Sequence, residues 1–330
     1  MSRQWQLNTA LAMLTLAGIA ISIFSGRAAA PLAQAMTALL SDDATALGLV
    51  MQEIRLPRAI LGALVGATLG LGGAVLQGLL RNPLAEPGLI GVSSTAALGA
   101  AVMFYTGLAA LFPLALPLGG MAGALAAAVL IQTLAGRNSS VLMLILAGIA
   151  VNAMAGALIA LVLNLAPSPY AALEIFFWLL GSLADRSFTH VVLALPLMAI
   201  GWALMAGQGR ALDALSIGEE TAASLGVNIV ALRARLIAGI ALSVGAAVAV
   251  SGVVGFVGLV VPHLLRPLVG HQPSHLLLPS ALGGAVLTLA ADSAVRLWWS
   301  GPELRLGVVT ALIGAPFFFA LLLRTRRALT

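Results

Sequence analysis

Lysine and cysteine are both absent from this sequence, and each absence excludes a class of chemistry. A phosphate-binding P-loop needs the lysine of its Gly-Lys-Ser/Thr motif, so the chain cannot hold an ordinary Walker-type ATPase site. Without cysteine there is no disulfide, no thiolate metal site and no cysteine nucleophile. Because clusters of other catalytic or metal-binding side chains are also not visible, we predict that the chain is not an enzyme and carries no metal or cofactor.

Charged residues are scarce as well. They occupy only 8% of the 330 positions, whereas apolar residues occupy 61%, and the mean hydropathy is +1.09. A soluble chain could not hide so much apolar surface. A spanning helix needs roughly 20 apolar residues, which leaves room for about ten crossings. We therefore predict an all-α polytopic membrane protein that forms a single transmembrane domain over residues 1–330.

Ten apolar runs, bounded by Arg, Pro, Gly or Asn, carry this prediction. The eighth run is short and is broken by Pro262, so we expect a half-crossing there. The runs are Leu7–Phe24, Pro57–Leu80, Gly88–Leu108, Leu111–Ala135, Val141–Leu165, Phe188–Gly207, Ile229–Val250, Val253–Pro267, His275–Trp298 and Leu306–Leu323.

The placement of arginine predicts the orientation of these runs, because cytoplasmic loops carry an excess of basic residues. With ten crossings and the N-terminus inside, ten arginines fall on the cytoplasmic side and six on the outer side. We therefore expect both termini to be cytoplasmic. Six outer arginines are more than lipid anchoring requires, and they are Arg27, Arg55, Arg58, Arg186, Arg296 and Arg305.

Three segments between the runs are expected to form helices of their own. A surface helix is predicted in Pro31–Ile54, and a short interfacial helix with an aromatic anchor is predicted in Ala166–Ser187. The inner segment Gln208–Asn228 is polar and rich in helix formers, which indicates one or two short helices outside the bilayer. Ser216 is a candidate N-cap there, with Glu219 three residues later as in a capping box.

Glycines recur four residues apart in the second run, at Gly62, Gly66 and Gly70. Small residues at this spacing lie on one helical face and let helix backbones approach closely in lipid. We interpret this glycine ladder, and the similar pair Gly119 and Gly123, as sites of helix packing.

Several stretches resemble a known family. The segment ETAASLG at 220–226 is similar to the Glu-Ala-Ala-x-x-x-Gly loop by which permeases of ATP-binding-cassette importers contact their ATPase subunits. The stretches RLPR at 55–58, NPLAEPGLIGVS at 82–93 and SGVVGFVGLVVPH at 251–263 look like the permeases, called type II importers, that import iron-siderophores, haem and vitamin B12. With LGVVT at 306–310, the resemblance spans about residues 50 to 324.

The resemblance implies a homodimer in the bacterial inner membrane, with the pathway along the dimer axis. Two ATP-binding-cassette ATPase subunits would lie beneath it and would hold ATP and Mg²⁺, while a periplasmic solute-binding protein would dock above. The missing lysine agrees with this arrangement, since any ATP hydrolysis has to come from a partner. We expect contacts with lipid and with a metal-chelate substrate, and none with nucleic acid.

The resemblance also assigns roles to individual residues. It makes residues 208–228 a coupling loop, in which the expected ATPase contacts are Gly218, Glu219, Glu220, Ala222, Ala223, Leu225 and Gly226. It matches Arg55, Arg58 and Arg296 to arginines that pair with glutamates of the solute-binding protein, a role that suits the bidentate guanidinium fork. The alternatives are lipid anchoring or local pairing, for example of Asp292 with Arg296 at i,i+4.

A few polar residues at membrane depth are candidates for the pathway. In the resemblance, Asn82 and Leu84 lie near the cytoplasmic gate, although Asn-Pro is also an ordinary helix stop and turn. Asn152 and Asn164 either line the pathway or hydrogen-bond between helices. His263, near His271 and His275, could suggest metal ligation, but no ligand spacing is convincing and we expect structural hydrogen bonding.

Two other classes of function are weaker alternatives. An ion-coupled secondary transporter would need carboxylates facing the pathway near the midplane, yet nearly every acid falls at a run boundary or in a loop, with Asp292 the deepest. An intramembrane enzyme would need a catalytic cluster. Within the importer class we expect an iron chelate, with haem first and a ferric siderophore or cobalamin as alternatives, because no residue fixes the cargo.

Overall fold

The computed structural model describes residues 3–26, 30–40, 45–112, 114–136, 140–298 and 303–329. These residues form helices and turns, without a strand. In chain order the elements are α1 (Arg3–Phe24), α2 (Leu32–Leu40), α3 (Ala46–Leu49), η1 (Val50–Arg55), α4 (Leu56–Leu79), η2 (Pro87–Ile90), α5 (Val92–Tyr105), α6 (Leu108–Leu111), α7 (Ala115–Ala135), α8 (Val141–Asn164), α9 (Pro169–Leu179), α10 (Phe188–Ala206), α11 (Gly209–Ile217), α12 (Glu219–Ser224), α13 (Ile229–Ser251), α14 (Val257–Leu265), η3 (Arg266–Val269), α15 (Pro273–Trp298) and α16 (Leu306–Leu329).

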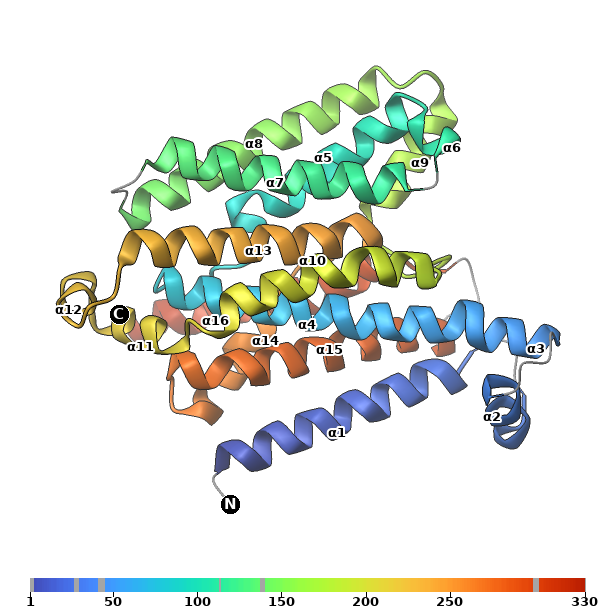
Figure 1. Cartoon of the computed structure of the whole chain (residues 1–330), viewed down its shortest axis with the longest axis horizontal. Coiled ribbons are helices and arrows are strands. Elements are labelled where there is room, and N and C mark those ends of the chain that lie inside the picture. Colours follow the sequence, from blue (N-terminus) through green and yellow to red (C-terminus); the bar gives the residue numbers. More distant parts are fainter. Residues whose placement is uncertain are drawn as a thin grey trace.

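The long helices run side by side along one direction, and the short helices gather at the two ends of this bundle (Figure 1). We call the end with α11 and α12 the inner end, and the end with α2, α3, α6 and α9 the outer end. Helix α1 begins and α16 ends at the inner end (Figure 1). This arrangement agrees with termini on one side of the membrane, and their cytoplasmic location stays a prediction. Arg27 lies outside the described residues, as does Arg137, one of the arginines expected inside.

All ten predicted runs contain a helix, but not all of these helices are long. Within the described residues, seven helices are long and apolar enough to cross a membrane, namely α1, the continuous helix Ala46–Leu79, α7, α8, α10, α13 and α15. The runs that contain α5, α14 and α16 form shorter apolar helices. The all-α membrane fold is therefore confirmed, whereas the count of ten crossings stays a prediction.

The centre of the bundle consists of α4 and α13. Their most apolar windows are each 78% buried inside the chain, against 11% for α1 and 22% for α8. Helix α4 packs on α15, α14, α13 and α10, and α13 packs also on α7 and α5. A helix that is apolar all round is buried in this way by neighbours on every side.

The glycine ladder brings the backbones of two helices into contact at this centre. A Cβ atom added to Gly66 would lie 2.3 Å from the carbonyl oxygen of Gly284 in α15, and one added to Gly70 would lie 1.9 Å from that of Ser280. Gly73 meets Gly258 of α14 in the same way, at 1.9 Å. The interpretation of the ladder as helix packing is confirmed.

The helices differ from the predicted runs at two places. The helix that contains the second run begins before Pro57, because one continuous helix extends from Ala46 through the π-helical turn η1 into α4. The short helix in the eighth run is confirmed as α14, but Pro262 lies inside it and does not break it. The break comes earlier, at residues 252–256, where Phe256 adopts a left-handed φ of 66° and caps α14. Such a conformation is strained for a bulky residue.

The contact at Gly70 makes a stability prediction. In an ordinary helix Gly→Ala is favourable by about 1 kcal/mol, because alanine has less backbone entropy to lose. Here Gly70→Ala would push α4 and α15 apart, since the new methyl group meets backbone and not a flexible side chain. We expect a loss of about 1–3 kcal/mol, seen as a lower Tm of the purified protein in detergent.

The control is Gly156→Ala in the middle of α8. A Cβ atom there would have no heavy atom within 4 Å, so this variant should match or exceed the wild-type Tm. Equal Tm values for the two variants would contradict the packing argument.

Candidate functional site

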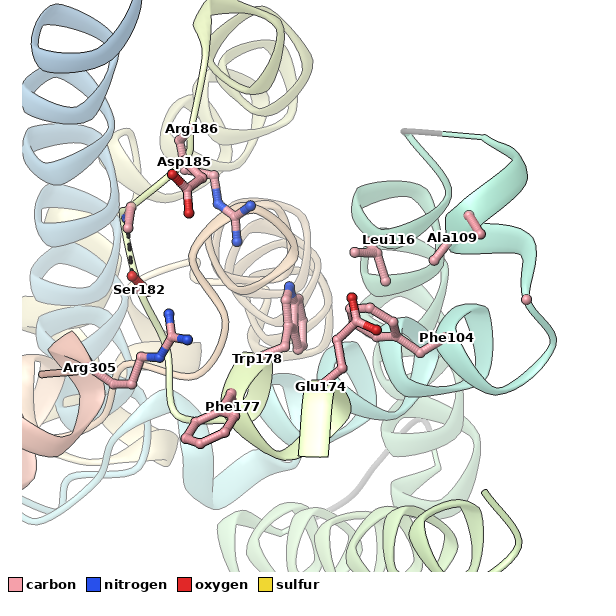
Figure 2. A pocket seen from close by; sticks show the side chains of 13 residues that line it. Phe104, Ala109, Leu116, Glu174, Phe177, Trp178, Ser182, Asp185, Arg186 and Arg305 are labelled. Atoms are coloured by element: carbon pink, nitrogen blue, oxygen red, sulfur yellow. Dashed lines mark hydrogen bonds between the residues drawn. The ribbon is translucent and has the colours of Figure 1, made fainter. Parts of the chain in front are cut away.

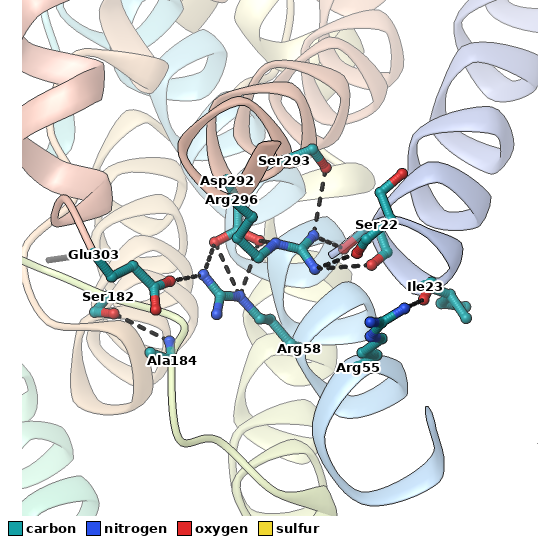
Figure 3. Close-up of polar contacts among 11 residues, drawn as sticks. Ser22, Ile23, Arg55, Arg58, Ser182, Ala184, Asp292, Ser293, Arg296 and Glu303 are labelled. Atoms are coloured by element: carbon teal, nitrogen blue, oxygen red, sulfur yellow. Dashed lines mark hydrogen bonds and ion pairs between the residues drawn. The ribbon is translucent and has the colours of Figure 1, made fainter. Parts of the chain in front are cut away.

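The outer ends of α4 and α15 are joined by a buried arginine–carboxylate cluster. Arg58 donates from Nη2 to Oδ1 of Asp292 over 2.7 Å and from Nε to Oδ2 over 3.0 Å. Both residues are buried, with exposed fractions of 8% and 3%. Arg58 also forms an ion pair with Glu303, and Nε of Arg296 lies 3.2 Å from Asp292 Oδ2 (Figure 3). The predicted local pair of Asp292 with Arg296 is confirmed.

The same cluster holds the end of α1. Arg296 donates from Nη2 to the Ser22 hydroxyl over 2.7 Å and from Nη1 to the Ser22 carbonyl oxygen over 2.9 Å. Arg55 donates to the carbonyl oxygen of Ile23 over 3.3 Å (Figure 3). Carbonyl groups in the last turn of a helix have no partner within the helix, so these arginines cap α1 from outside.

The internal partners bear on the predicted docking role of Arg55, Arg58 and Arg296. Arg55 is 6% exposed and Arg58 is 8% exposed, so their side chains lie inside the chain. Carboxylates of a docking partner would therefore have to replace the pairs of Arg58 with Asp292 and Glu303 and the hydrogen bond of Arg55 to Ile23. The docking role stays a prediction, and the cluster already has a structural role.

At the inner end the coupling loop folds into two helices, as the sequence predicts. Glu219 at the start of α12 places Oε1 2.7 Å from Nη2 of Arg233 in α13 and 3.6 Å from Nη2 of Arg81, just after α4. Asp213 of α11 accepts from the backbone N–H of Ser274, at the start of α15, over 2.8 Å. The coupling loop is thus attached to α4, α13 and α15.

The electrostatics of Asp213 reflect this attachment. Burial opposes its ionisation, but hydrogen bonds from the side chain of Gln272 and from Ser274 outweigh it and lower the pKa of Asp213 below its ordinary value. The carboxylate therefore stays charged at neutral pH and holds α11 against α15.

The capping box predicted at Ser216 was wrong. Gly218 is the residue before α12, and it has no side chain with which to cap the helix. The Ser216 hydroxyl donates instead to the carbonyl oxygen of Asp213 over 2.6 Å. The Glu219 side chain does not cap the helix, because it forms salt bridges with Arg81 and Arg233.

One face of the coupling loop is exposed and partly apolar. Ile217 is 70% exposed and Leu225 is 65% exposed. Among the residues predicted to contact an ATPase, Glu220, Ala223, Leu225 and Gly226 are exposed, Gly218 and Glu219 are half-buried, and Ala222 is buried. Gly226 has a φ of 85°, which a residue with a side chain adopts only with strain.

The polar candidates for the pathway make local contacts. Asn82 accepts from the backbone N–H of Leu84 over 2.9 Å, which closes a turn after α4, so the helix-stop interpretation fits and gating stays a prediction. Asn152 of α8 is hydrogen-bonded to Ser94 of α5, which confirms an interhelical contact. Asn164, at the end of α8, is exposed. None of these contacts tests whether the residues line a pathway.

His263 does not make the expected hydrogen bond through Nδ1. Its ring packs edge-on against Phe317, with centroids 5.7 Å apart, and Nδ1 is buried without a partner. Within the described part of the chain no three His, Asp or Glu side chains are placed to hold a metal ion.

Sequence reasoning missed the polar contact of α4 with α14 and with η3, which follows it. Gln77 is 1% exposed and donates to the carbonyl oxygen of Leu259 over 3.3 Å, while its Oε1 accepts from Arg266. A polar residue in an apolar run was the available signal, since a buried amide needs a partner.

The outer cluster makes a second stability prediction. Asp292→Asn would leave Arg58 and Arg296 buried with one carboxylate fewer between them, and breaking one side of a buried pair typically costs about 3–5 kcal/mol. We expect a markedly lower Tm and reduced yield. Glu303→Gln is the matched control, because the Glu303 side chain is 36% exposed and its removal should cost less than about 1 kcal/mol. Similar losses in both variants would contradict the central position of Asp292.

Comparison with known proteins agrees with this geometry. The model of the FecCD transport family matches residues 14–324. An uncharacterized ABC transporter permease, YvrB of Bacillus subtilis, is 43% identical over 283 residues, which cover 84% of this chain and 80% of that protein. The hemin transport system permease HmuU of Yersinia pestis is 40% identical over 284 residues, 83% of each chain. The vitamin B12 import permease BtuC of Vibrio cholerae is 41% identical over 277 residues, 82% of each chain.

A solved structure gives the same result for the fold. A metal-chelate type ABC transporter in an inward-facing conformation aligns with a TM-score of 0.84 and 31% identity, covering 97% of this chain and 99% of that one. The match includes both the outer arginine cluster and the coupling loop within residues 14–324. The chain is therefore an integral membrane protein and belongs to the FecCD transport family of ABC importer permeases.

Proposed function

We propose that two copies of this chain form the permease of an ATP-driven, binding-protein-dependent importer that moves an iron chelate across the inner membrane by alternating access. The observation that carries the proposal is the coupling loop. It exposes Ile217 and Leu225 at the inner end, and salt bridges from Glu219 attach it to α4 and α13. Exposed apolar residues on a loop that is held rigidly are suited to a protein partner.

The attachment of the loop explains how a partner could move the bundle. Two ATPase subunits, which bind ATP and Mg²⁺, would each press on α12 of one copy. Because Glu219 and Asp213 tie the loop to α4, α13 and α15, a displacement of α12 would move these helices as one body. Packed interfaces switch between discrete arrangements, so the displacement would open one end of the pathway and close the other.

An apolar cavity of about 810 Å³ between the end of α9, residues 253–256 and α16 supports the cargo class. Its lining includes Leu180, Phe256, Leu312 and Phe319 and has no charged residue. Facing a second copy, this cavity would line a common pathway on the dimer axis. A wall without charges suits a large, mostly apolar chelate.

The choice of cargo rests on the relatives. Haem comes first because the Yersinia pestis relative is a hemin permease, and ferric siderophores remain within the same class. Cobalamin is the second candidate, since vitamin B12 permeases are equally similar to this chain. The alternative of an ion-coupled transporter is less favoured. It would need a carboxylate that faces the pathway, and Asp292, the deepest candidate, forms ion pairs with Arg58 and Arg296.

We also propose that a periplasmic solute-binding protein delivers the cargo at the outer end. Arg55, Arg58 and Arg296 gather there, and guanidinium groups are suited to bidentate pairing with acidic groups of a partner. Lipid would surround the exposed apolar faces, and we expect no nucleic-acid partner.

Reconstitution in liposomes tests the proposal. With its ATPase and binding protein present, the permease should take up haem only when ATP is supplied, and vanadate should block the uptake. The permease alone under a pH gradient should take up nothing. Uptake driven by the pH gradient in the absence of the ATPase would contradict the importer mechanism.

A variant of the coupling loop tests the contact with the ATPase. Leu225→Asp replaces an exposed apolar side chain by a charge, and loss of one buried leucine from an interface is worth about 1.5–3 kcal/mol. We therefore expect ATPase affinity to fall at least about tenfold, with loss of binding-protein-stimulated ATP hydrolysis, as measured by co-purification and phosphate release. Leu111→Asp, at a position 82% exposed at the outer end, should leave both unchanged. Normal ATPase stimulation in Leu225→Asp would show that this face is not the contact.

A further inference from the structure

A second cavity, of about 500 Å³, opens at the outer end between α9, the segment after it and the start of α16. Two arginines and two carboxylates line it together with aromatic side chains (Figure 2). The charged residues are Arg186, Arg305, Glu174 and Asp185. None of them belongs to the outer arginine cluster or to the coupling loop, so this cavity has no role in the sites described above.

The two arginines lack the internal partners that Arg58 and Arg296 have. Nε of Arg186 is buried without a hydrogen-bond partner. Among the described residues, neither Arg186 nor Arg305 forms a salt bridge. Burial lowers the pKa of the Arg186 guanidinium, the charge of Asp185 raises it, and the charge of Arg305 lowers it again. An anion placed between the two guanidinium groups would offset the free-energy cost of burying Arg186 and would reduce the repulsion between the two positive charges.

An aromatic ring positions Arg305, and a turn of the backbone directs the chain at Arg186. The guanidinium carbon of Arg305 lies 5.5 Å from the centroid of the Phe177 ring, a cation–π contact. Arg186 follows Asp185, whose left-handed φ of 56° turns the chain at this point. Figure 2 shows both side chains pointing into the same cavity from one side. A guanidinium group that is already positioned, as that of Arg305 is by the Phe177 ring, binds a carboxylate with less loss of side-chain entropy.

An aromatic wall lies beside the cations. Trp178 packs edge-on against Phe104, with centroids 6.4 Å apart, and both rings line the cavity. Glu174 stands on the other side of Trp178 from Arg305 (Figure 2). Arg186, with Asp185 beside it, and Arg305 lie on one side of this wall, and Glu174 lies on the other (Figure 2). The carboxylate of an acidic ligand would therefore be favoured between the two guanidinium groups and opposed near Glu174.

We infer that Arg186 and Arg305 form a carboxylate-binding subsite in which the acidic group of a mostly apolar cargo docks as it enters the permease. This inference rests on the proposed import function and deepens it by naming a chemical class: chelates that carry free carboxylates, such as a porphyrin with propionates, and not corrinoids whose side chains are amides. The cavity is larger than one acidic side chain, which favours the cargo over a glutamate of the binding protein as the source of the carboxylate.

The test is equilibrium binding to the full chain in lipid nanodiscs, without ATPase or binding protein. The probes are iron(III) protoporphyrin IX and its dimethyl ester, which lacks the negative charges. Binding is followed by quenching of tryptophan fluorescence, and Trp178→Phe shows which part of the signal comes from the cavity. We expect the acid to bind about tenfold more tightly than the ester, as one charge-assisted hydrogen bond would give, and added salt to remove most of this difference.

Variants assign the effect to named residues. Arg186→Gln and Arg305→Gln should each weaken binding of the acid about tenfold and leave binding of the ester unchanged. Glu174→Gln should tighten binding of the acid, because it removes a like charge. Arg3→Gln, at the start of α1 at the inner end, is the matched control and should change neither.

Several results would overturn the inference. One is equal binding of acid and ester to the wild-type chain. Another is an equal loss of affinity for the acid in Arg3→Gln and in the two outer arginine variants. A third is that the outer variants weaken docking of the binding protein while porphyrin binding stays intact. Uptake by reconstituted vesicles separates this inference from the proposed function. If haem is imported normally by both arginine variants and their binding is unchanged, the subsite is wrong and the import function stands. If no import occurs while the acid-specific binding is present, the import function is wrong and the subsite stands.

Discussion

The close backbone contact of α4 with α15 and α14 is the constraint on which the rest of the structure depends. In lipid the hydrophobic effect does not drive helices together, so packing has to come from surfaces that fit. Gly66, Gly70 and Gly73 remove side chains from the contact and bring the backbone of α4 against Gly284, Ser280 and Gly258. This contact fixes both ends of α4, and each end carries one of the polar sites.

The two ends of α4 use polar residues differently. At the outer end Arg58 is sealed in a bidentate pair with Asp292, which joins α4 to α15 at the point where the glycine ladder ends. At the inner end Arg81 is 43% exposed at the side chain and lies 3.6 Å from Glu219. A buried pair is costly to break, whereas an exposed one is weak and exchangeable. The outer end of α4 is therefore fixed by a buried pair, whereas its inner end is only weakly attached to Glu219, which is itself held at 2.7 Å by the buried Arg233 of α13.

The sequence predicted those features that depend on residues close together in the chain. The glycine ladder, the pair of Asp292 with Arg296 and the two helices of the coupling loop are all set by residues a few positions apart. The pair of Arg58 with Asp292 spans 234 positions, and no local pattern specifies it. The capping box failed for the same reason, because Glu219 has distant partners in Arg81 and Arg233 that outweigh a local cap. Likewise, Pro262 was a plausible break, but the strained turn at Phe256 depends on packing against Gly314 of α16.

The outer arginines divide into two groups once their partners are known. Arg55, Arg58 and Arg296 form hydrogen bonds or ion pairs with α1, Asp292 and Glu303. These three arginines therefore hold helices together. Arg186 and Arg305 face a cavity beside Trp178 without a salt bridge among the described residues. The sequence counted all of them among outer cations too many for lipid anchoring, and it offered a role only for Arg55, Arg58 and Arg296. This division gives their excess a physical explanation. Fixed charges close the outer end of a bundle of glycine-packed helices, and the inferred subsite would use the two arginines that form no salt bridge. Because a guanidinium cannot lose its proton at physiological pH, the second group keeps its charge even where burial disfavours it, which lysine would not do as reliably.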